Sequence, residues 1–281
     1  MDSTEAKHDS LFQKVGILLV DWLLFFILSS LLSLMLYGLF QSGDEQQPST
    51  SFAQMIKDEA LMLLACLASM WVVLKAHKLP IGHCGWAVRP KQWLAGAATA
   101  VAVYLFAFVA TWLAGEVQVT GIRFEFTPFA LSLLAFLLVA VFEEVMVRGF
   151  ILARMLDLGI HKYLALVLSS LIFSSLHLFN PNFDLLPFLN IVLAGMMLGA
   201  TYIYTRNLSF PIALHWFWNW MQGVALGYPV SGNALDYSLL TVHYSDTVWL
   251  TGGNFGFEGS LFCSLMLVVV TALLIKYFKK A

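Results

Sequence analysis

The sequence predicts an all-α fold: a polytopic transmembrane helical bundle of about eight spans, with both termini in the cytoplasm. The first observation behind this prediction is composition, because 60% of the 281 residues are apolar and only 11% are charged. Soluble domains average about 25% charged residues. The second is that apolar runs close to the roughly 20 residues needed to cross a bilayer recur along the whole chain. The third is an asymmetry of charge between the loops.

The apolar runs define the predicted spans in order. They lie at 15–40, 59–76, 92–114, 128–148, 162–179, 185–204, 207–226 and 260–278. The segments between them are too short for a soluble domain of ordinary size. We therefore expect residues 1–281 to form a single integral membrane domain, with a motif-bearing core at about 128–226.

The loops between these spans predict the orientation. All but two of the 15 Lys and Arg residues fall in one set of alternate loops, which includes both chain ends. The opposite set holds only Lys57 and Arg123, together with most of the loop carboxylates. By the positive-inside rule, the side rich in Lys and Arg is cytoplasmic. We therefore expect a multi-pass protein, in the plasma (inner) membrane if the source is bacterial.

Several other features narrow the possible functions. No basic stripe is present, so we expect no nucleic acid as partner, and the apolar spans make the lipid bilayer an expected partner. The three cysteines have no spacing typical of a metal site or a disulfide framework. The loop 227–259 is longer than a connector requires and suggests a lid or a re-entrant segment. Asp21, inside the first span, is expected at the interface or paired with Lys14.

The first of three polar clusters within apolar runs is Glu143-Glu144…Arg148, late in the fourth span. On a helix, Glu144 and Arg148 are four residues apart and share a face, so we expect them to form an ion pair. Glu143 points about 100° away from that pair and has no local cation. The spacing predicts structural support from Glu144 and Arg148 and a free carboxylate at Glu143. Alternatively, both acids snorkel to the nearby interface.

The other two clusters lie in the fifth and seventh spans. Phe173 and His177 are four residues apart, and so are His215 and Asn219, which places each pair on one helical face. Singly, such residues serve as hydrogen-bonding contacts between helices. Ionisable groups within a membrane are costly, however, and three clusters together indicate a shared polar site. A carboxylate with two imidazoles is typical of an acid/base site, or of a metal site with an open position.

Taken in order, Glu-Glu-x-x-x-Arg, Phe-x-x-x-His and His-x-x-x-Asn on successive transmembrane helices resemble the CPBP family. This family covers the type II CAAX prenyl endopeptidases and the bacteriocin-processing or immunity (Abi) proteins. Each motif alone is weak, but the ordered set is specific. Asn219 occupies a position where some members carry Asp.

The resemblance implies an intramembrane endopeptidase that acts on a membrane-associated protein or peptide; a prenylated C-terminal peptide is one option. It implies that Glu143 is the general base that activates a water, with His177 helping to position or deprotonate that water. His215 and Asn219 would stabilise the oxyanion on the scissile carbonyl. In a metal-dependent version, Glu143, His177 and His215 would instead bind one divalent ion such as zinc. Asn219 favours the metal-free version, because its amide donates to an oxyanion but is a poor zinc ligand.

Two alternatives to a protease remain. The first is a non-catalytic immunity or scaffold protein of the same family, because a retained motif does not prove turnover. The second is a small transporter, because ionisable residues near the midplane also mark ion pathways. Transport is disfavoured by the lack of paired repeats with interrupted helices. The sequence has no His-Glu-x-x-His, so a standard zincin helix is excluded.

The predicted span boundaries conflict with a shared site. Counting about 1.5 Å per residue places Glu143 in the cytoplasmic half of the bilayer and His177 toward the outer half. The two residues meet only if the fifth span starts deep, tilts, or runs past residue 179. We expect the boundaries to be in error rather than the cluster, because helix ends are the least reliable part of a sequence-based prediction.

Overall fold

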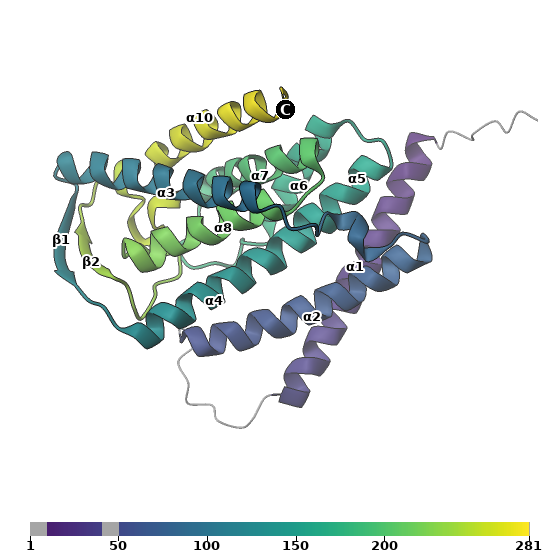
Figure 1. The fold of residues 1–281 in the computed structure, drawn as a ribbon, viewed down its shortest axis with the longest axis horizontal. Helices are drawn as coiled ribbons and strands as arrows, with labels where there is room; N and C mark the ends of the chain where they lie inside the picture. Colours follow the sequence, from purple (N-terminus) through teal and green to yellow (C-terminus); the bar gives the residue numbers. More distant parts are fainter. Residues whose placement is uncertain (1–9, 41–50, 281) are drawn as a thin grey trace, which may run out of the picture.

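The structure, a computed structural model, describes residues 10–40 and 51–280, and most of this chain is helical (Figure 1). The longer helices are α1 (Leu11–Phe40), α2 (Phe52–Ala76), α3 (Pro90–Leu113), α4 (Phe126–Glu144), α6 (Lys162–Ser175), α7 (Leu185–Thr205), α8 (Ser209–Trp220) and α10 (Leu261–Phe278). Shorter helical segments are η1 (Ile81–Cys84), η2 (Val145–Leu152), α5 (Ala153–Asp157), η3 (Met221–Ala225), α9 (Val248–Thr251), η4 (Gly253–Phe255) and η5 (Phe257–Gly259). The predicted all-α polytopic bundle is confirmed.

Each predicted span corresponds to a helix, but the helices differ in length. Within the described residues, six are long and apolar enough to cross a membrane. The other two are α6, with 14 residues, and α8, with 12 residues and a five-residue continuation in η3. The count of eight spans and the cytoplasmic position of both termini therefore stay predictions.

Polar side chains and prolines set the starts of several helices. Ser51 accepts a hydrogen bond from the Gln54 amide at 3.1 Å at the start of α2, and Ser260 accepts one from the Cys263 amide at 2.9 Å at the start of α10. Asp184 caps α7, and Pro90 occupies the first turn of α3, where its missing N–H costs nothing. The apolar runs continue from these points as helices, since an α-helix satisfies its own backbone in lipid.

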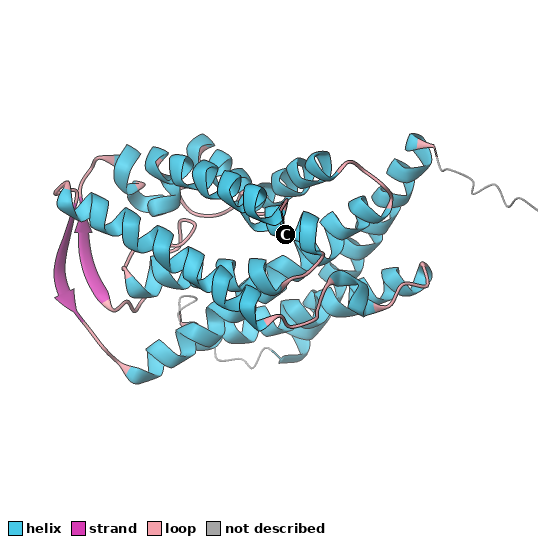
Figure 2. Ribbon diagram, turned by 45° about the horizontal axis from the view of Figure 1, so that its top comes forward, coloured by secondary structure: helices cyan, strands magenta, loops and turns pink. Residues whose placement is uncertain are grey.

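A two-stranded antiparallel sheet at one end of the bundle was not expected from the sequence (Figure 2). It pairs β1 (Val117–Ile122) with β2 (Leu240–Tyr244), and Val119 lies opposite Val242. Both strands carry β-branched residues, which favour extended backbone. They are too short and too far apart in the sequence to signal pairing. The sheet joins the loop after α3 to the long loop 227–259.

The helix α4 continues without a break through the π-helical segment η2 into α5, so the fourth apolar helix ends at Asp157. The predicted end at 148 is too early. The fifth helix ends at Ser175, earlier than the predicted 179. Glu143 and His177 consequently lie at similar heights, each about 20 Å along the chain from the connection between Asp157 and Lys162. The predicted difference in depth between Glu143 and His177 therefore came from the predicted span boundaries, which were in error.

Asp21 on α1 is buried, with 4% of its surface exposed, and does not pair with Lys14 as expected. Instead Arg154 on α5 donates to it from Nη2 at 2.7 Å, and His77 at the end of α2 contacts it at 2.7 Å. The expected pairing with Lys14 is wrong, because Arg154, the partner found, lies on the continuation of the fourth helix beyond its predicted end. These contacts join α1, α2 and α5.

Small residues let the central helices pack closely, as is common in membrane bundles. A Cβ at Gly96 of α3 would lie 2.5 Å from the Phe210 carbonyl oxygen of α8. A Cβ at Gly195 of α7 would lie 2.9 Å from the Ser170 Cβ of α6. These contacts fix α6, α7 and α8, which carry or support the predicted site.

Candidate active site

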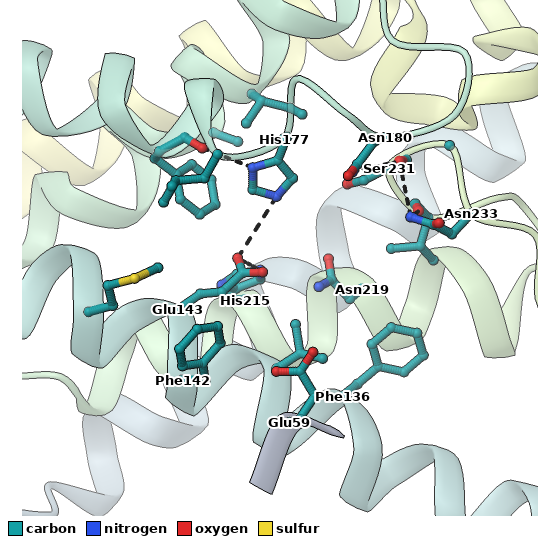
Figure 3. A pocket seen from close by; sticks show the side chains of 18 of the residues that line it. Glu59, Phe136, Phe142, Glu143, His177, Asn180, His215, Asn219, Ser231 and Asn233 are labelled. Carbon is teal, nitrogen blue, oxygen red and sulfur yellow. Dashed lines mark hydrogen bonds and ion pairs between the residues drawn. The ribbon is translucent and has the colours of Figure 1, made fainter. Parts of the chain in front are cut away.

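A cavity with a volume of about 1040 Å³ lies among α1, α2, α4, α6, α7 and α8 (Figure 3). All four predicted catalytic residues line it: Glu143, His177, His215 and Asn219. The loop 227–259, predicted to be a lid or a re-entrant segment, supplies residues 230–235 and Glu258 to the wall. At Gly232 (φ +86°) this loop approaches the Pro181 carbonyl so closely that a Cβ would lie 2.0 Å from its oxygen.

Glu143 is the last residue but one of α4, and its side chain is 21% exposed. Its Oε2 atom lies 4.0 Å from Nε2 of His177 and 3.7 Å from Nε2 of His215. Among the described residues this buried oxygen accepts no hydrogen bond. The two distances exceed those of direct hydrogen bonds. Glu143 is therefore an uncommitted carboxylate facing two imidazole rings.

His177 lies just past the end of α6, where the chain turns. Its Nδ1 atom is 2.9 Å from the Phe173 carbonyl oxygen. A carbonyl oxygen only accepts, so Nδ1 carries the proton and a neutral ring keeps its lone pair on Nε2. Nε2 is the atom that faces Glu143. His177 is thus oriented to accept a proton or a hydrogen bond on the side of the carboxylate.

His215 lies on α8 between the two neighbouring carboxylates. Its Nδ1 is 2.9 Å from Oε1 of Glu144, and its Nε2 faces Glu143. Because Oε1 of Glu144 also accepts from Arg148, Glu144 is an ionised acceptor and Nδ1 of His215 donates to it. A neutral His215 then presents a lone pair at Nε2. The ring donates from Nε2 only as an imidazolium.

Glu144 and Arg148 form the ion pair that their spacing predicts, at 2.5 Å, and Arg148 is only 1% exposed. Arg148 also donates from Nη2 to the Gly195 carbonyl oxygen at 3.0 Å, and its guanidinium lies 4.6 Å from the centre of the Phe173 ring. One buried cation thus holds η2 against α6 and α7.

Phe173 and Asn219 complete the motif residues at the site. The Phe173 ring lies edge-on to His177, with ring centroids 4.9 Å apart, and to His215 at 6.0 Å. It therefore spaces the two imidazoles, a role that sequence reasoning did not assign. Asn219, one turn after His215 on α8, lines the cavity beside it (Figure 3).

Two further carboxylates at the cavity were missed by sequence reasoning. Glu258 is buried, and it accepts hydrogen bonds from Trp218 Nε1 at 2.8 Å and from the Ser231 amide at 3.1 Å. It fixes the long loop to α8. Glu59 reaches the cavity from α2. Its only signal in the sequence is a carboxylate at the start of an apolar run, which reads equally well as the edge of a span.

The residues expected to bind zinc in the metal-dependent version do not fit a tetrahedral site as they stand. Zinc–nitrogen and zinc–oxygen distances near 2.0–2.1 Å place neighbouring ligand atoms about 3.3 Å apart. The separations of Glu143 Oε2 from the two imidazole nitrogens are 3.7 and 4.0 Å. Within the described residues, no group of three His, Cys, Asp or Glu side chains has the arrangement of a metal site.

Comparison with protein-family models matches residues 125–221 to the family described as type II CAAX prenyl endopeptidase Rce1-like. The matched segment is less than half of the chain, but it contains every residue of the three motifs. Searches of curated proteins and of solved structures found no match. Residues 125–221, which carry Glu143, His177, His215 and Asn219, therefore match the Rce1-like type II CAAX prenyl endopeptidase family, and this match supports the resemblance that the three motifs predicted.

Proposed function

We propose that this protein is an intramembrane endopeptidase that hydrolyses peptide bonds of membrane-associated substrates by a metal-free mechanism. The observation that carries the proposal is the placement of Glu143. Its buried Oε2 atom has no hydrogen-bond partner among the described residues and faces the Nε2 atoms of His177 and His215 across a cavity. The match to a protease family supports the reaction class.

The gap between Glu143 and His177 suits one water molecule. Both facing atoms, Oε2 and Nε2, are acceptors, and they lie 4.0 Å apart. A water about 2.8 Å from each would donate one hydrogen to each acceptor. It would then have its lone pairs free to attack a carbonyl carbon. Glu143 is placed to take the proton of this water as a general base, with His177 orienting it.

His215 and Asn219 are placed to stabilise the oxyanion. Because Glu144 accepts from Nδ1 of His215, the ring donates from Nε2 as an imidazolium flanked by two carboxylates. The Asn219 amide supplies a second donor from the next turn of the same helix. Such donors stabilise the tetrahedral intermediate in a site of low dielectric constant. Protonated Glu143 then gives its proton to the leaving amine nitrogen as the carbon–nitrogen bond breaks.

Replacing Glu143 with Gln tests the proposal, because it keeps the shape of the side chain and removes the base. Membranes from cells that carry the wild type, Glu143→Gln or the control Glu125→Gln are compared by quantitative proteomics. Glu125 is an exposed residue outside the cavity, paired with Arg123. Intact substrates should accumulate only with Glu143→Gln, and the purified variant should lose about 10²–10⁴-fold in turnover.

The outcome also separates this function from its alternatives. A purified Glu143→Gln protein that cleaves the recovered substrates at the wild-type rate would contradict the role of Glu143. If no membrane protein differs between the three membranes, a non-catalytic role within the same family becomes the better account.

A further inference from the structure

Glu59 is a carboxylate of the cavity that the proposed reaction does not use. It projects into the cavity from α2, a helix outside the family match, between Met55 and Met62 on the same face (Figure 3). The neighbouring Asp58 has a different environment, because it accepts a hydrogen bond from the Gln54 side chain at 2.7 Å. Glu59 thus faces the space in which a substrate would lie.

Within the part of the chain that the structure describes, one oxygen of the Glu59 carboxylate lacks a hydrogen-bond partner. Its Oε2 atom is buried and accepts no hydrogen bond from the described residues. Among the residues that line the cavity there is no Lys or Arg. The stretch 41–50, which the structure does not describe, contains neither residue in its sequence. Arg148, the buried cation behind the site, is committed to Glu144.

The charge of the cavity is therefore unbalanced. Of its three carboxylates, only Glu258 has its hydrogen bonds supplied by the protein, from Trp218, Gln222 and Ser231. Glu59 and Glu143 line the same cavity, so negative charges on the two carboxylates would repel each other. An unpaired carboxylate among apolar helices is costly and marks a functional position. A cationic ligand would give the Glu59 carboxylate a partner and would reduce the repulsion between Glu59 and Glu143.

We propose that Glu59 determines substrate specificity by binding a basic side chain, Lys or Arg, of the peptide being cleaved. This inference rests on the proposed function and adds a substrate class to it. Because Glu59 and Glu143 line the same cavity, a peptide whose scissile bond lies at Glu143 would place a neighbouring side chain in the space that Glu59 faces. Hydroxyls of Ser29, Ser30 and Ser33 on α1 also line the cavity and are acceptors for the hydrogens of an ammonium or guanidinium group.

A peptide library tests this inference even while the natural substrate is unidentified. Purified full-length protein in nanodiscs is incubated with peptides derived from a membrane proteome, and cleavage sites are read by mass spectrometry. Wild type, Glu59→Gln, Glu59→Lys and Glu143→Gln are compared. The matched control is Asp58→Asn, which removes one negative charge from the adjacent residue, outside the cavity lining. Melting temperatures verify that each variant is folded.

The expected result is an enrichment of Lys and Arg at one position near the sites cleaved by the wild type. For a matched pair of peptides, Lys against Gln at that position, kcat/KM should differ by about 10–100-fold, the range of a charged hydrogen bond. Glu59→Gln should remove this difference and Asp58→Asn should keep it. Glu59→Lys should favour the same peptide carrying Glu.

The other outcomes overturn the inference in distinguishable ways. Glu143-dependent cleavage by the wild type with no basic preference would overturn the role of Glu59 and leave the proposed function intact. A basic preference that survives in Glu59→Gln would do the same. An equal loss of activity of Glu59→Gln on all peptides would also overturn the inference, because it would place Glu59 in the catalytic step. No Glu143-dependent cleavage by the wild type would overturn the proposed function and this inference with it.

Discussion

The two walls of the cavity are built differently. On the wall formed by α4, η2, α7 and α8, the charged groups behind the cavity have named partners: Arg148 binds Glu144 and the Gly195 carbonyl, and Glu144 binds His215. On this wall Glu143, which faces the cavity, keeps an unsatisfied oxygen. On the wall formed by α1 and α2, Glu59 has an unsatisfied oxygen. Packing differs in the same way, because 67% of the apolar window of α7 is buried but only 17% of that of α1.

Under the proposed function, the α4–α7–α8 wall carries catalysis and the α1–α2 wall carries substrate recognition. Groups that act on a scissile bond must be held in place by their surroundings, and the α4–α7–α8 wall does this with buried ion pairs and close helix contacts. Within the α1–α2 wall, α1 is the less buried helix, because among its described side chains only Leu18, Asp21 and Phe25 are buried, whereas 39% of the apolar window of α2 is buried. Figure 1 shows α1 and α2 together at the edge of the bundle.

The largest effect on stability should follow from breaking the ion pair between Glu144 and Arg148 on the α4–α7–α8 wall, which we call the rigid wall. Glu144→Ala or Arg148→Ala leaves a buried charge without its partner, which costs about 3–5 kcal/mol. Melting temperature and expression should fall together with activity. Glu125→Ala, which breaks the exposed pair with Arg123, is the control and should leave the melting temperature unchanged. An Arg148→Ala protein with the wild-type melting temperature would remove the distinction between the walls.

A second effect concerns the chemistry of the same wall. If His215 is an oxyanion donor, His215→Ala should cost about 10²–10³-fold in turnover. Activity should survive treatment with a chelator, and the purified wild type should hold no stoichiometric metal. Elemental analysis before and after chelation measures the metal content of the purified wild type, His215→Ala and His177→Ala. About one equivalent of zinc that is lost in His215→Ala would show that the ligands rearrange around a metal, against the metal-free proposal.

The smallest effect on the free energy of unfolding should come from a substitution on the α1–α2 wall. Ser29→Ala removes one hydroxyl from the α1 lining and should change the free energy of unfolding by no more than about 0.5 kcal/mol. The matched change on the rigid wall is Gly195→Ala, whose new methyl group would meet the Ser170 Cβ at 2.9 Å. Overpacking of this kind costs about 1–3 kcal/mol. Equal losses of melting temperature in the two variants would contradict the comparison.

The sequence predicted the helices and the meeting of the motifs because both depend on local patterns. An apolar run in lipid has one good backbone solution, and a spacing of four residues places Glu144 with Arg148 whatever surrounds them. The start of the second span was less well predicted. Residues Phe52–Glu59 already belong to α2, but several of their side chains are polar, so a search for apolar runs does not detect this part of the helix.

Features that depend on distant parts of the chain could not be predicted. β1 and β2 are more than a hundred residues apart, so their pairing has no local signal. The role of Glu258 depends on Trp218 and Ser231, which only the fold brings near it. The partner of Asp21 was missed because Arg154 lies past the predicted end of its helix.

The π-helical segment η2 has a consequence for the spacing of the chain. A π-helix bonds each residue to the fifth one along, so η2 shifts α5 out of phase with α4. One residue of an α-helix corresponds to a rotation of about 100°. Gaining or losing a single residue between Arg148 and Ala153 would therefore turn Arg154 away from Asp21, while leaving every motif residue unchanged. The number of residues in this segment, as well as their identity, therefore sets the direction in which α5 presents Arg154 to Asp21 of α1.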